Sequence, residues 1–279
     1  TLDLEDILDR NVVANLTRLG NKEHRSLAFT LDRPMELMIH AIGEGEDGEL
    51  HDYGWIVEGR SRETIWEMRY RNSEHAGGAE KNRSVQEVLA FAAGSYIVHF
   101  VTDGSHAYRH WNEAPPFEPE RWGITIVSID PGFTPDHVAA YDPDDDPAIL
   151  ASIRHVRNRT SQSRRFAMDR DGEVVVYALG EGSRGDMYDY GWIENAADRS
   201  VVWQMEYWMT DDAGGADKNR VYRGQLHLSA GTYVLHYHSD GSHAFQSWNA
   251  SPPHDPESWG VTVFRVERPR HIEDPSRGR

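Results

Sequence analysis

Two loops of the chain bring together side chains that could bind a ligand or carry out chemistry. Each loop follows an apolar segment and contains an aspartate, a serine, a histidine, a tryptophan and an asparagine. Binding residues often lie on loops that a rigid scaffold holds in place. The candidate ligand-binding residues are Asp103, His106, Trp111 and Asn112 in the first loop and Asp240, His243, Trp248 and Asn249 in the second.

The same loops give little support for nucleophilic catalysis. Ser105 and His106 are adjacent in sequence, a spacing that does not by itself pair a nucleophile with a base. The serine also lacks the strand, turn and helix of a nucleophile elbow. A structural role accounts for these residues, because Asp-Gly forms a turn and Ser and Asn bond to nearby backbone. We therefore predict that the protein is not an enzyme, and that His106 and His243 hydrogen-bond to backbone or to nearby side chains.

A second group of candidate residues is acidic and lies in glycine-rich segments, residues 43–52 and 180–189. Calcium prefers several oxygen ligands from a flexible loop, which carboxylates and carbonyls of such segments supply. The spacing differs from that of an EF-hand, and acidic loops are expected in a chain with a net charge of −17. The candidate calcium ligands are Glu44, Asp47, Asp52, Glu181, Asp186 and Asp189.

Two glycine-rich motifs at residues 76–83 and 213–220 superficially resemble a phosphate-binding loop. Neither contains the Gly-Lys-Ser/Thr of a P-loop, and no helix is predicted after them. We expect Lys81 and Lys218 to form salt bridges with carboxylates instead.

Composition excludes several classes of protein. The net charge of −17 argues against nucleic-acid binding, which needs a basic surface. No apolar run is long enough for a membrane span. The absence of cysteine excludes disulfides, thiolate metal sites and cysteine nucleophiles.

An internal repeat organises the sequence. Shifting the chain by 137 residues aligns it with itself without a gap, so that the segment at residues 52–56 matches residues 189–193. The match begins at residues 12–21 and 149–158, which predicts a short leading helical or irregular segment in each copy. We predict two domains, residues 1–134 and 135–279, joined by a Pro- and Asp-rich linker at about residues 130–147.

Both copies have the pattern of β-strands. Residues 64–70 alternate polar side chains with Trp66, Met68 and Tyr70, which indicates a half-buried strand. Short apolar runs bounded by Gly, Asp or Pro indicate further strands, at residues 36–42, 95–101 and 123–129 and their counterparts 137 positions later. The predicted fold is mainly all-β, a tandem repeat of two antiparallel β-sandwich or jelly-roll domains.

One strand in each copy has a recognisable relative. The segments Ala-Gly-Ser-Tyr-Ile-Val at residues 93–98 and Ala-Gly-Thr-Tyr-Val-Leu at residues 230–235 resemble the late strand of bacterial pre-peptidase C-terminal domains. Those domains are small β-sandwich modules attached to secreted enzymes. The resemblance covers this strand and its turn, and it implies an exported module, outside the cell or at its surface.

These observations predict a non-catalytic, exported structural or adhesive protein that is stabilised by calcium and assembles with other protein chains into a surface structure or filament. One alternative is a carbohydrate-binding module, whose glycans would stack on Trp111 and Trp248 if these line an open groove. The other is a metal-dependent hydrolase, which needs three histidine or carboxylate side chains that converge on one point.

Overall fold

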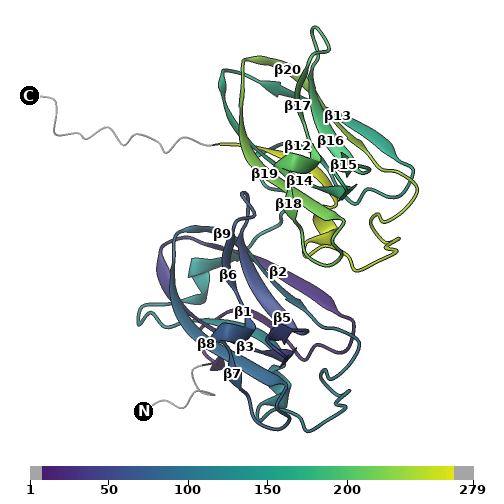
Figure 1. The fold of residues 1–279 in the computed structure, drawn as a ribbon. Coiled ribbons are helices and arrows are strands. Elements are labelled where there is room, and N and C mark those ends of the chain that lie inside the picture. The colour runs from purple at the N-terminus through teal and green to yellow at the C-terminus, as the bar shows by residue number, and fades with distance from the viewer. Residues whose placement is uncertain (1–7, 267–279) are drawn as a thin grey trace, which may run out of the picture. The chain divides into compact units, whose positions relative to one another are not determined.

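A computed structural model describes residues 8–266, and the ends of the two predicted domains, residues 1–7 and 267–279, lie outside this range. The chain divides into two compact units, Thr1–Asp144 and Asp145–Arg279. Both consist of antiparallel strands, which confirms the predicted all-β class (Figure 1). Between residues 8 and 266, no helix has both the length and the apolar character needed to cross a membrane.

Unit 1 is built from two sheets. The first contains, in spatial order, β1 (Val12–Thr17), β10 (Gly123–Ser128), β3 (Met35–Glu46), β8 (Asn82–Phe91) and β7 (Glu74–His75), with β4 (Glu49–Leu50) paired to β3. The second contains β11 (Val138–Ala140), β2 (His24–Leu31), β9 (Gly94–Val101), β5 (Tyr53–Glu58) and β6 (Thr64–Glu67).

Unit 2 has the corresponding sheets. The first contains β12 (Ile149–Ile153), β21 (Gly260–Arg265), β14 (Gly172–Ser183), β19 (Asn219–Leu228) and β18 (Asp211–Asp212), with β15 (Asp186–Met187) paired to β14. The second contains β13 (Ser161–Met168), β20 (Gly231–His238), β16 (Tyr190–Asn195) and β17 (Val201–Gln204). The strand pairing also matches: Trp55 faces His99 in unit 1, and Trp192 faces His236 in unit 2.

Short 3₁₀ helices are the other regular elements of the described chain. They are η1 (Tyr70–Asn72), η2 (Pro119–Arg121), η3 (Pro135–His137), η4 (Tyr207–Met209) and η5 (Pro256–Ser258).

The core of unit 1 lies between its two sheets. Ile39 and Ile126 from the first sheet and Val98 from the second are completely buried in it. The predicted inner face of β6 is also there, with Trp66 5% exposed. Such alternation of buried and exposed side chains is what a strand with one face on a core requires.

The structure corrects the prediction for the leading segment of each copy. Residues 12–17 and 149–153 form neither helices nor irregular loops: they are edge strands β1 and β12, paired with β10 and β21. Pairing satisfies the backbone of these segments while Val13, Leu16 and Ile153 enter the cores, and this tertiary gain decides the conformation of a short segment. The predicted linker also contains a strand, because β11 pairs with β2.

Candidate functional site

Strand pairing brings the acidic residues of unit 1 to one end of the sandwich. β5 begins at Tyr53, which pairs with Val101 at the end of its antiparallel neighbour β9. Asp52 precedes β5 and Asp103 follows β9, so the two aspartates are neighbours although they are far apart in sequence. Glu44 lies near the end of β3 in the other sheet. Both sheets therefore contribute to one acidic cluster.

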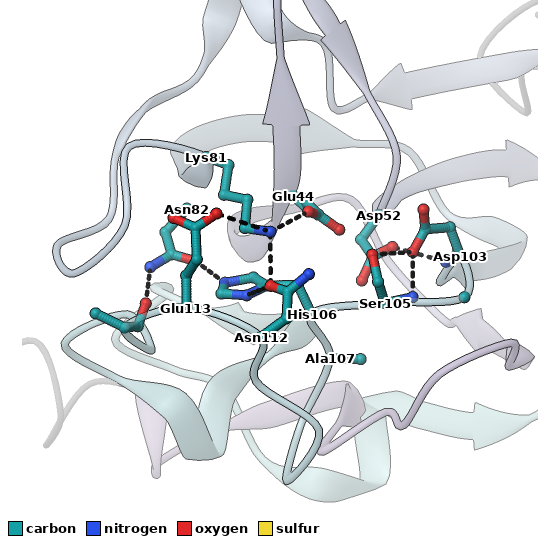
Figure 2. Close-up of polar contacts among 12 residues, drawn as sticks. Glu44, Asp52, Lys81, Asn82, Asp103, Ser105, His106, Ala107, Asn112 and Glu113 are labelled. Atoms are coloured by element: carbon teal, nitrogen blue, oxygen red, sulfur yellow. Dashed lines mark hydrogen bonds and ion pairs between the residues drawn. The ribbon is translucent and has the colours of Figure 1, made fainter.

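Three carboxylates form this cluster. Glu44, Asp52 and Asp103 each place one oxygen within 4.8 Å of the others. Glu44 is 4% exposed and Asp52 is completely buried, whereas Asp103 is exposed. Figure 2 shows the Glu44 carboxylate between the Lys81 ammonium and the two aspartates.

Unit 2 has an equivalent cluster of Glu181, Asp189 and Asp240, again with oxygens within 4.8 Å of one another. Glu181 is 6% exposed and Asp189 is completely buried. Two sites of the same composition are therefore present in the described chain.

A glycine allows each buried aspartate to approach its neighbouring strand. A Cβ atom added to Gly43 would lie 2.0 Å from the carbonyl oxygen of Asp52, and one added to Gly180 would lie 2.0 Å from that of Asp189. No side chain fits at that distance. The glycines that suggested a flexible loop in the sequence thus serve close packing of the backbone around the acidic clusters.

Burial dominates the electrostatics of both clusters. Desolvation raises the pKa of Asp52 from 3.8 to about 8 and that of Asp189 to about 7, although backbone amides donate to both. Burial also raises the pKa of Glu44 and of Glu181. Without a further cation, protons are needed to reduce the charge of each cluster near neutral pH.

One carboxylate oxygen in each cluster is buried without a hydrogen-bond partner. Lys81 Nζ lies 3.0 Å from Glu44 Oε1, but Oε2 of the same carboxylate has no partner. Lys218 Nζ lies 2.8 Å from Glu181 Oε1, and Glu181 Oε2 is likewise unpartnered. These ion pairs confirm the salt bridges predicted for the two lysines. A buried unpartnered carboxylate oxygen is costly unless a proton, a hydrogen-bond donor or a cation meets it.

A polar network connects the cluster of unit 1 to the histidine loop (Figure 2). Lys81 Nζ also donates to Asn112 Oδ1 at 2.7 Å, and Asn112 Oδ1 lies 2.7 Å from His106 Nδ1. His106 Nε2 lies 2.7 Å from Asn82 Oδ1. The Asn82 amide nitrogen donates to the carbonyl oxygens of Gly77 and Ala114, so its oxygen faces the imidazole and Nε2 is the donor.

The histidines are structural parts of this network. His106 and His243 are completely buried, and both ring nitrogens of each lie within 2.9 Å of asparagine oxygens, as the prediction of hydrogen-bonded rings requires. Burial lowers the pKa of His106 and lowers that of His243 to about 4, with a further contribution from Lys218. In both imidazoles the two ring nitrogens face asparagine oxygens and not the hydroxyl of Ser105 or Ser242.

The structure separates the predicted residues into three groups. Glu44, Asp52, Glu181 and Asp189 lie in the acidic clusters. Asp47, in the turn between β3 and β4, and Asp186, at the start of β15, are exposed and contribute no oxygen. Asp103 and Asp240, predicted as residues of the ligand loops, complete the clusters. Lys81, Lys218, Asn82 and Asn219 were not among the predicted site residues.

The two loop tryptophans are packed against completely buried tryptophans. Trp111 meets Trp122 edge-on, with ring centroids 4.9 Å apart, and Trp248 meets Trp259 in the same way at 5.0 Å. Both are half-buried. Both rings therefore pack against buried core residues, as large aromatic side chains commonly do.

Comparison with known proteins assigns no family to this chain and gives weak similarities to solved structures. No protein-family model matches the sequence, and no curated protein matches it. Among solved structures, the chain aligns with the CUB1-EGF-CUB2 domains of rat MASP-1 at 9% identity and a TM-score of 0.26, covering 90% of this chain and 94% of that one. It aligns with the ANX2 ectodomain from Arabidopsis thaliana at 8% identity and a TM-score of 0.23, covering 90% of each chain. At these TM-scores the similarities carry no argument about the function of the chain.

Proposed function

We propose that each unit binds one calcium ion at its acidic cluster, and that the protein is a non-catalytic, exported structural or adhesive module stabilised by these ions. The observation that carries the proposal is the buried, unpartnered oxygen of Glu44 beside Asp52 and Asp103, repeated at Glu181. Its partner in the native protein would be a cation.

The charge and chemistry of the cluster favour a hard divalent ion. When all groups are ionised, three carboxylates and the Lys81 ammonium carry a net charge of −2, which a divalent cation neutralises. All candidate ligands are oxygens, the donor type that calcium and magnesium prefer and zinc sites use less. Calcium is the better match, because it accepts irregular sets of oxygen ligands, while magnesium demands near-octahedral geometry.

The hydrolase alternative shares the convergence of three carboxylates but lacks other parts. A hydrolytic site also needs a base or nucleophile with a free position, and both nitrogens of His106 are held by asparagines. A metal that secures loops at the end of a sandwich needs no such group. For an exported module we expect a calcium dissociation constant of about 10⁻⁴–10⁻³ M. As partners of such a module we propose other protein chains.

Calorimetric titration and thermal melting test the calcium sites. Two ions should bind per chain, and calcium at about 100 times its dissociation constant should stabilise each native site by about 2.7 kcal/mol. For units of this size that corresponds to a rise in melting temperature on the order of 10 °C. The Glu44→Gln/Glu181→Gln double variant should lose this rise. Glu46→Gln, which changes an exposed carboxylate on the same strand as Glu44, should keep it.

Two results would contradict the proposed function. If melting temperatures of the wild-type chain are equal in calcium and in chelator, and titration shows no heat of binding, the proposed sites do not bind calcium. If calcium binds and calcium-dependent cleavage of a panel of ester, phosphate or glycoside substrates is lost in the double variant, the non-catalytic part of the proposal is wrong.

A further inference from the structure

We infer that the two calcium sites are unequal, that unit 1 binds the ion more tightly, and that Ser239 sets the difference. This inference rests on the proposed calcium sites and concerns how a side chain beside them controls affinity. In both units a lysine pairs with one oxygen of the buried glutamate and the other oxygen has no partner, although Lys81 also lies 3.6 Å from Oε1 of the exposed Glu113. The hydrogen bonds of the two buried aspartates differ inside the clusters themselves.

Asp52 in unit 1 accepts one hydrogen bond at each carboxylate oxygen. The Asp103 amide donates to Oδ1 at 2.7 Å, and Trp122 Nε1 donates to Oδ2 at 3.1 Å. An ionised carboxylate has about four lone-pair positions, two on each oxygen. Each oxygen of Asp52 therefore retains one position for a cation.

Asp189 in unit 2 accepts one hydrogen bond more. The Asp240 amide donates to Oδ1 at 2.8 Å, while Oδ2 receives both Ser239 Oγ at 2.7 Å and Trp259 Nε1 at 3.3 Å. Both lone-pair positions of Oδ2 are thus occupied. A cation at this site either binds Asp189 through Oδ1 alone or displaces the serine hydroxyl.

The residue equivalent to Ser239 in unit 1 is Thr102, and its hydroxyl has other partners. Thr102 Oγ1 donates to the carbonyl oxygen of Gly20 at 2.6 Å and accepts from the amide of Glu23 at 2.9 Å. The hydroxyl of Thr102 makes no hydrogen bond to Asp52, so it does not compete with a cation for that carboxylate. Thr102 and Ser239 therefore occupy the same position in the two units but differ in whether the hydroxyl bonds to the buried aspartate.

The expected size of the difference follows from the hydrogen bond that must be replaced. Hydrogen bonds to charged groups are among the strong ones in proteins, and displacing one should weaken binding by about tenfold, the equivalent of about 1.4 kcal/mol. Calcium titrations at pH 9, where both buried aspartates are ionised, measure this without competition from protons. Glu181→Gln leaves the site of unit 1 intact and Glu44→Gln leaves that of unit 2.

Four full-length variants test the inference. The Glu181→Gln chain should bind calcium about tenfold more tightly than the Glu44→Gln chain. Adding Ser239→Ala to Glu44→Gln should remove most of this difference. Adding Thr102→Val to Glu181→Gln should change the affinity of unit 1 less than about threefold, because this hydroxyl does not touch Asp52. Far-ultraviolet circular dichroism and melting of each variant in the absence of calcium establish that it is folded.

Each contrary result would refute one specific part of the inference. Equal affinities of the two single-site chains, or a weaker site after Ser239→Ala, would refute the role of Ser239 and leave the calcium sites standing. Absence of binding in wild type would refute the proposed function itself. A Thr102→Val chain that loses as much as Ser239→Ala gains would show that the loop, and not the hydroxyl on Asp189, controls affinity.

Discussion

Raising the pH from 5 to 8 should destabilise the calcium-free protein, and calcium should reduce this effect. The pKa of Asp52 is raised to about 8 and that of Asp189 to about 7 in the native state, against 3.8 for an unperturbed aspartate. Between these values the native protein binds more protons than the unfolded chain. The free energy of unfolding therefore falls as the pH rises, and the contribution ends once the pH exceeds the native pKa.

The magnitude follows from the size of the shifts. Each group whose protonation differs between the two states contributes about 1.4 kcal/mol per pH unit. From pH 5 to 7 each unit should lose about 3 kcal/mol through its buried aspartate, and unit 1 should lose roughly 1 kcal/mol more up to pH 8. Calcium competes with these protons for the carboxylates, so it should stabilise the native protein more at pH 8 than at pH 5 and make this slope shallower.

Urea unfolding at pH 5, 6, 7 and 8 measures the effect. One series contains calcium at millimolar concentration, and the other is calcium-free with potassium chloride at the same ionic strength. Repulsion among the other carboxylates of this acidic chain contributes to both series, so the difference between them isolates the two clusters. Parallel pH dependences in the two series would refute the link between the buried aspartates and calcium.

Two further predictions concern the loops around the clusters. Asn82→Ala removes a completely buried amide that donates to two loop carbonyls, and it should lower the free energy of unfolding by about 3 kcal/mol in urea titrations; a wild-type value would contradict the network. Gly78→Ala places a Cβ 1.9 Å from the carbonyl oxygen of Pro115 at a φ of +68°, and it should cost more than about 2 kcal/mol in the same assay. Gly48→Ala, also at positive φ but with nothing within 4 Å, should cost about 1 kcal/mol, and equal losses would show that the close approach is unimportant.

Local patterning predicted β3, β6, β9 and β10 but not β2, β5 and β8, nor the edge strands β1, β11 and β12. Trp66 and Met68 alternate with polar residues, and the structure buries both. The segments of β1, β11 and β12 are short, and their conformation depends on pairing with β10, β2 and β21. Because that pairing depends on the tertiary structure, the hydrophobic pattern within each segment does not predict it.

The acidic clusters were only partly predictable for a related reason. The glycine-rich segments identified Glu44 and Asp52 but also Asp47, since sequence proximity does not say which side chain points to the sandwich and which to solvent. Asp103 joins the cluster because β5 and β9 are antiparallel neighbours. Deriving that pairing first would have placed the residue before one strand beside the residue after the other, and the third carboxylate would have followed.

The repeated polar motifs of the chain have one physical explanation in common. Lys81 neutralises part of the acidic cluster and holds Asn112, which meets His106, and Asn82 fixes the other side of the imidazole while bonding to the loop backbone. Asn82 and His106 are buried, Lys81 is half-buried and Asn112 is exposed, and each has a partner. A fully partnered polar network orders loops instead of destabilising them. A histidine used in this way is unavailable as a general base. The one group that the network leaves without a partner is the Glu44 carboxylate oxygen, which is why the missing component is best sought there and not at the histidine.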